Sequence, residues 1–146
     1  MSELKRRVQG NQAMPAFDVE PEELVVFEVD NEYLFSQYFE QTDLFEDLSG
    51  YYNDTEYRFE IPADEFDAVR ERLENAYYDP VIVTDLEPYC VVIDKYDEHA
   101  EILKQSVATW ERQRKRFFLM KDDLAVKEAI GRGAEHISDT DFVVGL

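Results

Sequence analysis

Short apolar runs along the chain predict strands. The run LVVFEV at 24–29 is continuous and rich in branched residues, which favours a strand. In TEYRFEIP, Tyr57, Phe59 and Ile61 alternate with charged residues, which predicts a half-buried strand. Two further runs, VIV and CVVI, lie on either side of a turn, LEP. Because both runs are continuous, we expect them in the middle of a sheet, covered on both faces.

Helical spacing is clearest in ADEFDAVRERLENAYY. Phe66, Val69 and Leu73 lie on one face of this stretch, and acidic residues crowd its first turn, where the helix dipole favours negative charge. A second helix is predicted over 30–50, where Leu34 and Phe45 belong to a series at helical spacing. Several aromatic residues close together leave a strand open as the alternative for that segment.

One long helix is predicted over 98–131, with Asp97 as its cap and Asp122 as the cap of a second piece if the helix breaks. The segment WERQRKRFFLM lies within it. On a helical wheel, Arg112, Lys115 and Arg116 face solvent.

Two residues of the same segment do not fit a plain solvated face. Arg114 falls in the apolar stripe of the wheel, so we expect it to pair with a carboxylate inside the molecule or with a partner. Leu119 lies on the basic side, where it would be an exposed anchor for a contact surface.

The order of elements predicts an α+β fold. We expect a small mixed sheet of four to five strands, with helices mainly on one face and a long C-terminal helix. Residues 1–16 are predicted to form an N-terminal arm, 17–131 a single domain and 132–146 a C-terminal tail. The tail ends in FVVGL, which would be a short edge strand or an apolar plug.

Charge changes this picture more than any motif does. The 146 residues carry 34 acids and 15 bases, a formal net charge of -19. Such a chain repels itself in dilute salt, and molar salt reduces the screening length to about 3 Å. The composition is therefore similar to that of haloarchaeal proteins and favours adaptation to a high-salt environment. The alternative is an acidic mimic of nucleic acid that binds a basic partner.

The charges are also uneven along the chain. Residues 8–57 hold thirteen acids and no base, whereas 104–132 hold eight bases and four acids. Lys5, Arg6 and Arg7 form a second basic spot near the N-terminus. These two basic segments are candidate contacts with protein partners, and they leave a nucleic-acid-binding regulator open as an alternative function.

No motif indicates catalysis, a cofactor or a metal. Asp94, Asp97, His99 and Glu101 are metal-capable residues near one predicted helix start, but their spacing matches no standard site and favours capping. The single cysteine, Cys90, excludes an internal disulfide and is expected to fill the core. We therefore expect no enzyme activity and no cofactor.

The sequence thus predicts a soluble structural or protein-interaction subunit. Without a secretory signal or an apolar run of membrane-spanning length, it is expected in a cytoplasm or a virion, with no membrane contact. Its partners would be other protein subunits, in a homo-oligomer or in a larger assembly such as the neck, tail or connector of a haloarchaeal virus. The arm, the tail and the last helix would provide the contacts.

Overall fold

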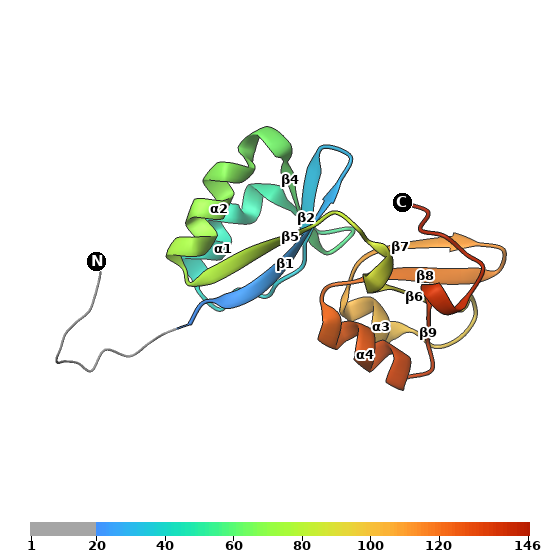
Figure 1. The fold of residues 1–146 in the computed structure, drawn as a ribbon. Coiled ribbons are helices and arrows are strands. Elements are labelled where there is room, and N and C mark those ends of the chain that lie inside the picture. Colours follow the sequence, from blue (N-terminus) through green and yellow to red (C-terminus); the bar gives the residue numbers. More distant parts are fainter. Residues whose placement is uncertain (1–19) are drawn as a thin grey trace.

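The computed structural model describes residues 20–146, which form two β-sheets with helices on their outer faces (Figure 1). The strands are β1 Glu22–Val29, β2 Glu32–Phe35, β3 Tyr52–Asn53, β4 Arg58–Pro62, β5 Tyr78–Val83, β6 Cys90–Asp94, β7 Ser106–Arg112, β8 Lys115–Met120 and β9 Glu135–His136. The helices are α1 Thr42–Leu48, α2 Phe66–Asn75, α3 Ala100–Lys104 and α4 Asp123–Gly131. The predicted α+β class is confirmed, with two sheets in place of one.

Each sheet is built from one continuous part of the chain. The first has the strand order β3-β4-β2-β1-β5 and is mixed, since β1 pairs in parallel with β5 and antiparallel with β2. The second has the order β7-β8-β6-β9, and its strand pairs are antiparallel. The short 3-10 turn Glu87–Tyr89 precedes the second sheet. No strand of one sheet pairs with a strand of the other in the part of the chain described.

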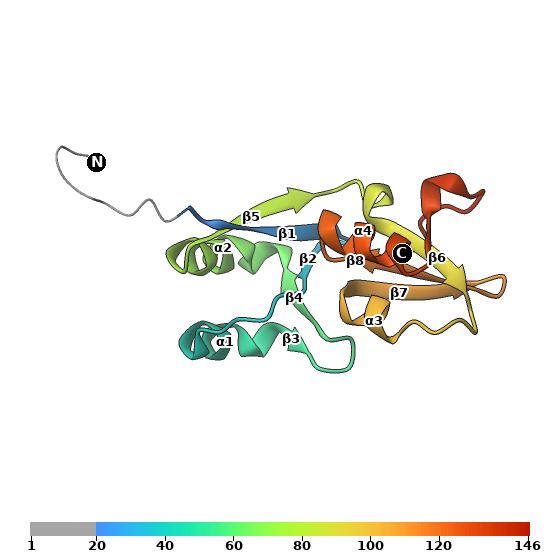
Figure 2. The same cartoon turned by 90° about the horizontal axis from the view of Figure 1, so that it is seen from below.

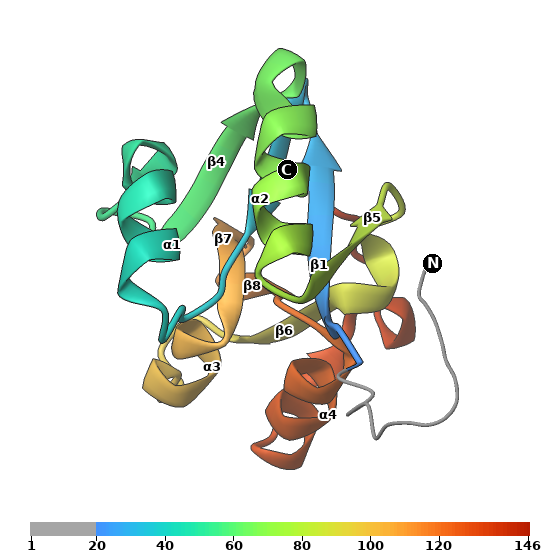
Figure 3. The same ribbon diagram turned by 90° about the vertical axis from the view of Figure 1, so that its left-hand side faces the viewer.

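The two sheets stack face to face, so the molecule has four layers: helices, sheet, sheet, helices. Successive side chains of β1 point to opposite faces of the first sheet: Val26 packs toward α1 and α2, whereas Phe27 packs toward the second sheet. In β8, Phe117 faces the first sheet and Phe118 faces α3 and α4. Figure 3 shows α2 lying across the outer face of the first sheet. Three apolar clusters therefore fill the three spaces between the layers.

The predicted strand at 24–29 and the predicted helix around Phe66 are both confirmed as β1 and α2. Phe66, Val69 and Leu73 are buried against the first sheet, as their spacing predicts. The alternating strand is confirmed as β4, where Phe59 and Ile61 are buried. Tyr57, assigned to the same buried face, instead lies in the turn before β4 and is exposed.

The predicted helix over 30–50 is wrong for its first half. Asp30 and Asn31 have φ values of 49° and 64° and form a two-residue turn that joins β1 to β2. Aspartate and asparagine tolerate this left-handed conformation better than other residues with a side chain, so the pair forms a hairpin turn instead of a helix cap. Only 42–48 of the segment is α-helical, as α1.

The long helix over 98–131 is also wrong. The segment divides into α3, the hairpin of β7 and β8, and α4. Gln113 and Arg114, with φ values of 52° and 64°, form the turn of the hairpin. The second cap is right, because the Asp122 carboxylate accepts a hydrogen bond from the Ala125 amide at 2.8 Å and begins α4. Within residues 20–146, no helix has the length and apolar character needed to cross a membrane.

The two runs VIV and CVVI lie in different sheets. CVVI in β6 is buried on both faces between β8 and β9, as predicted. VIV lies in β5, an edge strand of the first sheet, and is only half-buried. The two sheets are also joined by a polar contact, in addition to the apolar cluster between them. The Arg58 guanidinium donates a hydrogen bond to the Val107 carbonyl at 3.2 Å.

Cys90 fills the core between the sheets and donates a hydrogen bond from its thiol to the Leu86 carbonyl at 3.3 Å. Burial raises the pKa of the thiol to about 12. At about pH 8, alkylation of native protein by iodoacetamide should be about 10³-fold or more slower than in denaturant, because only unfolded chains react. Mass spectrometry checks this. Rapid labelling of folded protein would contradict the burial.

The C-terminal residues 142–146 form no strand and cover part of the second sheet. Phe142 lies edge-on to Phe117, with ring centroids 5.0 Å apart, and Val144 packs on the same cluster. A Cβ added at Gly145 would lie 2.8 Å from Nε1 of Trp110. Residues 142–146 therefore pack as an apolar plug on their own molecule, whereas the earlier part of the predicted tail contains β9.

Gly145→Ala should displace this plug. Because the added methyl group meets the Trp110 ring, we expect a loss of about 1–3 kcal/mol in the free energy of unfolding and a red shift of tryptophan emission. Trp110 is the only tryptophan, so its fluorescence reports the tail directly. Gly50→Ala, where nothing lies within 4 Å of the added Cβ, is the matched control. Identical emission in both variants would show that the tail is not packed there.

Candidate functional site

A cationic β-hairpin is the first candidate contact surface. It is formed by residues 111–116, here called the hairpin tip, at the end of β7 and β8. Arg112 is directly opposite Lys115, which leaves Gln113 and Arg114 as the two turn residues. Figure 2 shows the tip projecting at the end of the molecule farthest from α1 and α2.

Part of the positive charge near the tip is neutralised within the molecule. Glu111 pairs with Arg116 at 2.6 Å and with Lys95 at 3.3 Å. Lys115 pairs with Asp94 on the neighbouring strand, and this hydrogen bond raises the pKa of the Lys115 ammonium group. Two carboxylates thus hold three of the cations against the sheet.

Arg112 and Arg114 differ from these three cations. Both side chains are exposed, and no ion pair of either is found within residues 20–146. They lie on a short turn between two paired strands, so the backbone that carries them is held by the sheet. The tip therefore presents two guanidinium groups to solvent on a fixed support.

The predicted contact residues have different outcomes. Arg112 and Arg116 lie at the tip, but on strands and not on a helix. Arg114 is in the turn and not in an apolar stripe, so the predicted internal pairing is not found within the described residues. Leu119 is fully buried between the two sheets, because β8 alternates its faces, and so it cannot be an exposed anchor. The predicted basic spot at 5–7 (Lys5, Arg6 and Arg7) lies outside the described residues.

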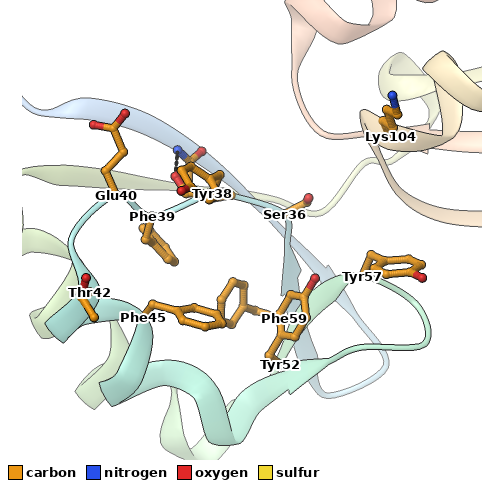
Figure 4. A pocket seen from close by; sticks show the side chains of 11 residues that line it. Ser36, Tyr38, Phe39, Glu40, Thr42, Phe45, Tyr52, Tyr57, Phe59 and Lys104 are labelled. Carbon is orange, nitrogen blue, oxygen red and sulfur yellow. Dashed lines mark hydrogen bonds between the residues drawn. The ribbon is translucent and has the colours of Figure 1, made fainter.

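An aromatic cleft, which sequence reasoning missed, is the second candidate surface (Figure 4). It has a volume of about 480 Å³ and lies where the first half of the chain meets Lys104 at the end of α3. We call it the Tyr38 cleft. Its lining residues are Ser36, Gln37, Tyr38, Phe39, Glu40, Thr42, Phe45, Tyr52, Tyr57, Phe59 and Lys104.

The cleft has a rigid floor and an exposed aromatic rim. Phe59 is fully buried and contacts the Phe39 and Tyr52 rings, with centroid distances of 5.5 and 5.0 Å. On the rim, Tyr38 is 82% and Tyr57 67% exposed. Because aromatic residues are enriched at protein–protein interfaces, an exposed aromatic rim is a candidate contact surface.

The surroundings of the cleft are acidic. Glu40 lines both the cleft and a second hollow on the other side of Tyr38, and that hollow is also lined by Glu20 and Glu22. The one lysine of the cleft, Lys104, forms an ion pair with Glu101 at 3.1 Å. The excess charge beside Tyr38 is therefore negative.

The sequence carried a weak signal for this cleft. Tyr33, Phe35 and Phe39 lie close together in the sequence, a pattern that leaves a strand open as the alternative to a helix, and Tyr38 lies next to Phe39. This pattern predicts the cleft only if the turn at Asp30 is known, because the turn determines which of these rings are buried in the core and which are exposed.

The metal-capable residues near α3 do not form a cluster. Within residues 20–146, no three carboxylate, imidazole or thiol groups are arranged to hold a metal ion. Nδ1 of His99 lies 3.0 Å from the Asp97 carbonyl oxygen, and the predicted cap at Asp97 is not observed because α3 begins at Ala100.

Comparisons of the chain with protein-family models, with curated proteins and with solved structures found no match.

Proposed function

We propose that this chain is a non-enzymatic protein-interaction subunit that works in high salt, and that its hairpin tip binds a carboxylate-bearing surface of another protein molecule. The observation that carries the proposal is the backbone of Arg114, with φ of 64°. This left-handed conformation costs a residue with a side chain about 1 kcal/mol or more, and glycine or asparagine is usual in such a turn.

The two-residue hairpin turn between β1 and β2 follows the usual preference. Asp30 and Asn31 have similar backbone angles, and their short polar side chains suit them. Arginine at 114 has no such local benefit, and the same is true of Gln113 beside it. What supports a role in binding at 114 is the exposed guanidinium group that the turn presents to solvent. Arg112, one residue before the turn, adds a second guanidinium group that is also exposed.

Guanidinium groups suit binding in concentrated salt. They form paired hydrogen bonds to carboxylates and stack on aromatic rings, and both contacts require close geometry as well as charge. In molar salt the screening length is about 3 Å, so attraction between charges that lie farther apart is largely lost. A contact of two arginines with a protein carboxylate and ring surface therefore keeps more of its affinity than a diffuse attraction does. Such a contact would suit the neck, tail or connector subunit of a haloarchaeal virus that the composition leaves open.

Nucleic-acid binding is supported less well. Proteins that bind a duplex through its backbone neutralise about 6–10 phosphates with cations on one face. At the tip, Asp94 and Glu111 offset three of the cations and would face the phosphates.

A binding experiment tests the proposal. Three tagged proteins are used in molar KCl to capture proteins from a lysate of the producing cells. They are wild type, Arg112→Glu/Arg114→Glu, and a control with the same charge change, Lys127→Glu/Arg132→Glu, at exposed positions in α4 and just after it. We expect wild type and control to capture an acidic polypeptide, and the tip variant to lose it. An untagged copy of this chain would count as such a polypeptide. Equal capture by all three overturns the proposal. Tip-dependent retention of a labelled DNA duplex instead favours the nucleic-acid function.

A further inference from the structure

Resting on the proposed function, we infer that the surface bound by the hairpin tip is the Tyr38 cleft of a second copy of this chain, so that copies join head to tail. The two surfaces complement each other in charge and in shape. The tip is convex and carries two exposed arginines, whereas the cleft is concave, aromatic and bordered by carboxylates.

The chemistry of the cleft fits a guanidinium group. Tyr38 and Tyr57 expose most of their surface, which leaves ring area on which a planar cation can stack. Glu40 lies beside Tyr38 and is a carboxylate that can accept hydrogen bonds from the same cation. The chain already uses the aromatic half of this contact, because the Arg70 guanidinium carbon lies 5.2 Å from the centre of the Phe66 ring.

The two surfaces cannot meet within one molecule. Lys104 lines the cleft just before β7 begins, and Arg112 ends the same strand at the tip. A strand of seven residues is about 23 Å long at about 3.3 Å per residue, and its pairing with β8 keeps it extended. Figure 2 shows β7 between α3 and the turn of the hairpin. The tip therefore needs the cleft of another copy.

A contact between two different surfaces of identical chains is heterologous. It leaves one tip and one cleft free in every pair, so further copies can add until a ring closes or a filament grows. The cleft, at about 480 Å³, is within the size range of sites that enclose a ligand, which is sufficient for one or two side chains of the tip. The bulk of the surface remains acidic and solvated.

Sedimentation velocity of the full-length chain in molar KCl tests the inference. We expect wild type to associate as its concentration rises. Arg112→Glu/Arg114→Glu should weaken self-association by about 100-fold or more, and so should Tyr38→Ala/Glu40→Lys in the cleft. Lys127→Glu/Arg132→Glu and Leu124→Ala/Glu128→Lys make the same kinds of change at exposed positions in α4 and at its C-cap, and should associate as wild type does. Circular dichroism confirms that each variant is folded.

Mixing the two single-surface variants is the decisive step. The tip variant retains an intact cleft, and the cleft variant retains an intact tip. Equal amounts should therefore form a dimer with one intact contact and nothing larger, although each variant alone is monomeric. A mixture that stays monomeric overturns the inference.

Other outcomes identify other occupants of the cleft. If Lys5→Glu/Arg6→Glu/Arg7→Glu abolishes association and the tip variant does not, the N-terminal segment binds there and the inference is wrong. If wild type is monomeric at every concentration, the inference also fails. Tip-dependent capture of a different acidic protein would then leave the proposed function standing, whereas capture that does not depend on the tip would refute both.

Discussion

Phe27→Ala should lower the free energy of unfolding by about 3–5 kcal/mol and should destabilise both sheets together. Phe27 is fully buried on β1, where it points into the space between the sheets and meets the Tyr89 ring edge-on, with centroids 5.2 Å apart. Removing the ring leaves a cavity between the two halves of the chain, and the sheets cannot close it without moving toward each other.

Urea unfolding followed by two probes measures this effect. Trp110 fluorescence reports the second sheet, and far-ultraviolet circular dichroism reports the whole chain. Both transitions should move together to lower urea. Phe45→Ala removes a ring of the first half that is 42% exposed, and it should cost about 1.5 kcal/mol or less because only part of the ring is buried. Separate transitions for the two probes would show that the inter-sheet core does not couple the halves.

Potassium chloride should stabilise the fold strongly. Between about 0.1 M and 1 M salt the screening length falls from about 10 Å to about 3 Å, which removes most of the repulsion among the carboxylates of a chain with net charge -19. We expect the thermal midpoint to rise by roughly 10 °C, equivalent to about 3 kcal/mol for a chain of this size. Differential scanning calorimetry at several salt concentrations checks this.

A charge-reduced variant separates repulsion from other effects of salt. Glu28, Asp54 and Glu56 are exposed, and no ion pair of theirs is found in residues 20–146. Their replacement by Gln, Asn and Gln should raise the midpoint in dilute buffer and reduce its dependence on salt. A wild-type midpoint that does not change with salt would refute the high-salt adaptation inferred from composition.

Local patterns were sufficient where the local preference and the final packing agree. The stripe Phe66, Val69 and Leu73 determines which face of α2 is buried, whatever the rest of the fold is. The same holds for CVVI in β6, because a continuous apolar run suits a strand with two covered faces. The class of the fold follows from such elements, but the number of sheets does not.

The sequence was misleading where a turn lacks its usual residues. Gln113 and Arg114 adopt the backbone of a tight hairpin without glycine or asparagine, so periodicity alone continues as a helix through them. This single turn changes the faces of all nearby residues. It moves Arg114 from an apolar stripe to the tip, and it moves Leu119 from the surface to the core. The Tyr38 cleft could not be predicted because the turn at Asp30, which determines which of its rings are exposed, was itself not predicted, and because Lys104 comes from the other half of the chain.

The division of the strands between two continuous stretches of chain has a practical consequence. The connection at 84–86 joins β5 to the 3-10 turn before β6, and Thr84 and Asp85 are exposed. A cut there breaks none of the strand pairs described, since each sheet keeps all of its own strands. Two separately expressed fragments would thus retain complementary apolar faces, which makes this connection the natural position for a split-protein reporter or a circular permutation.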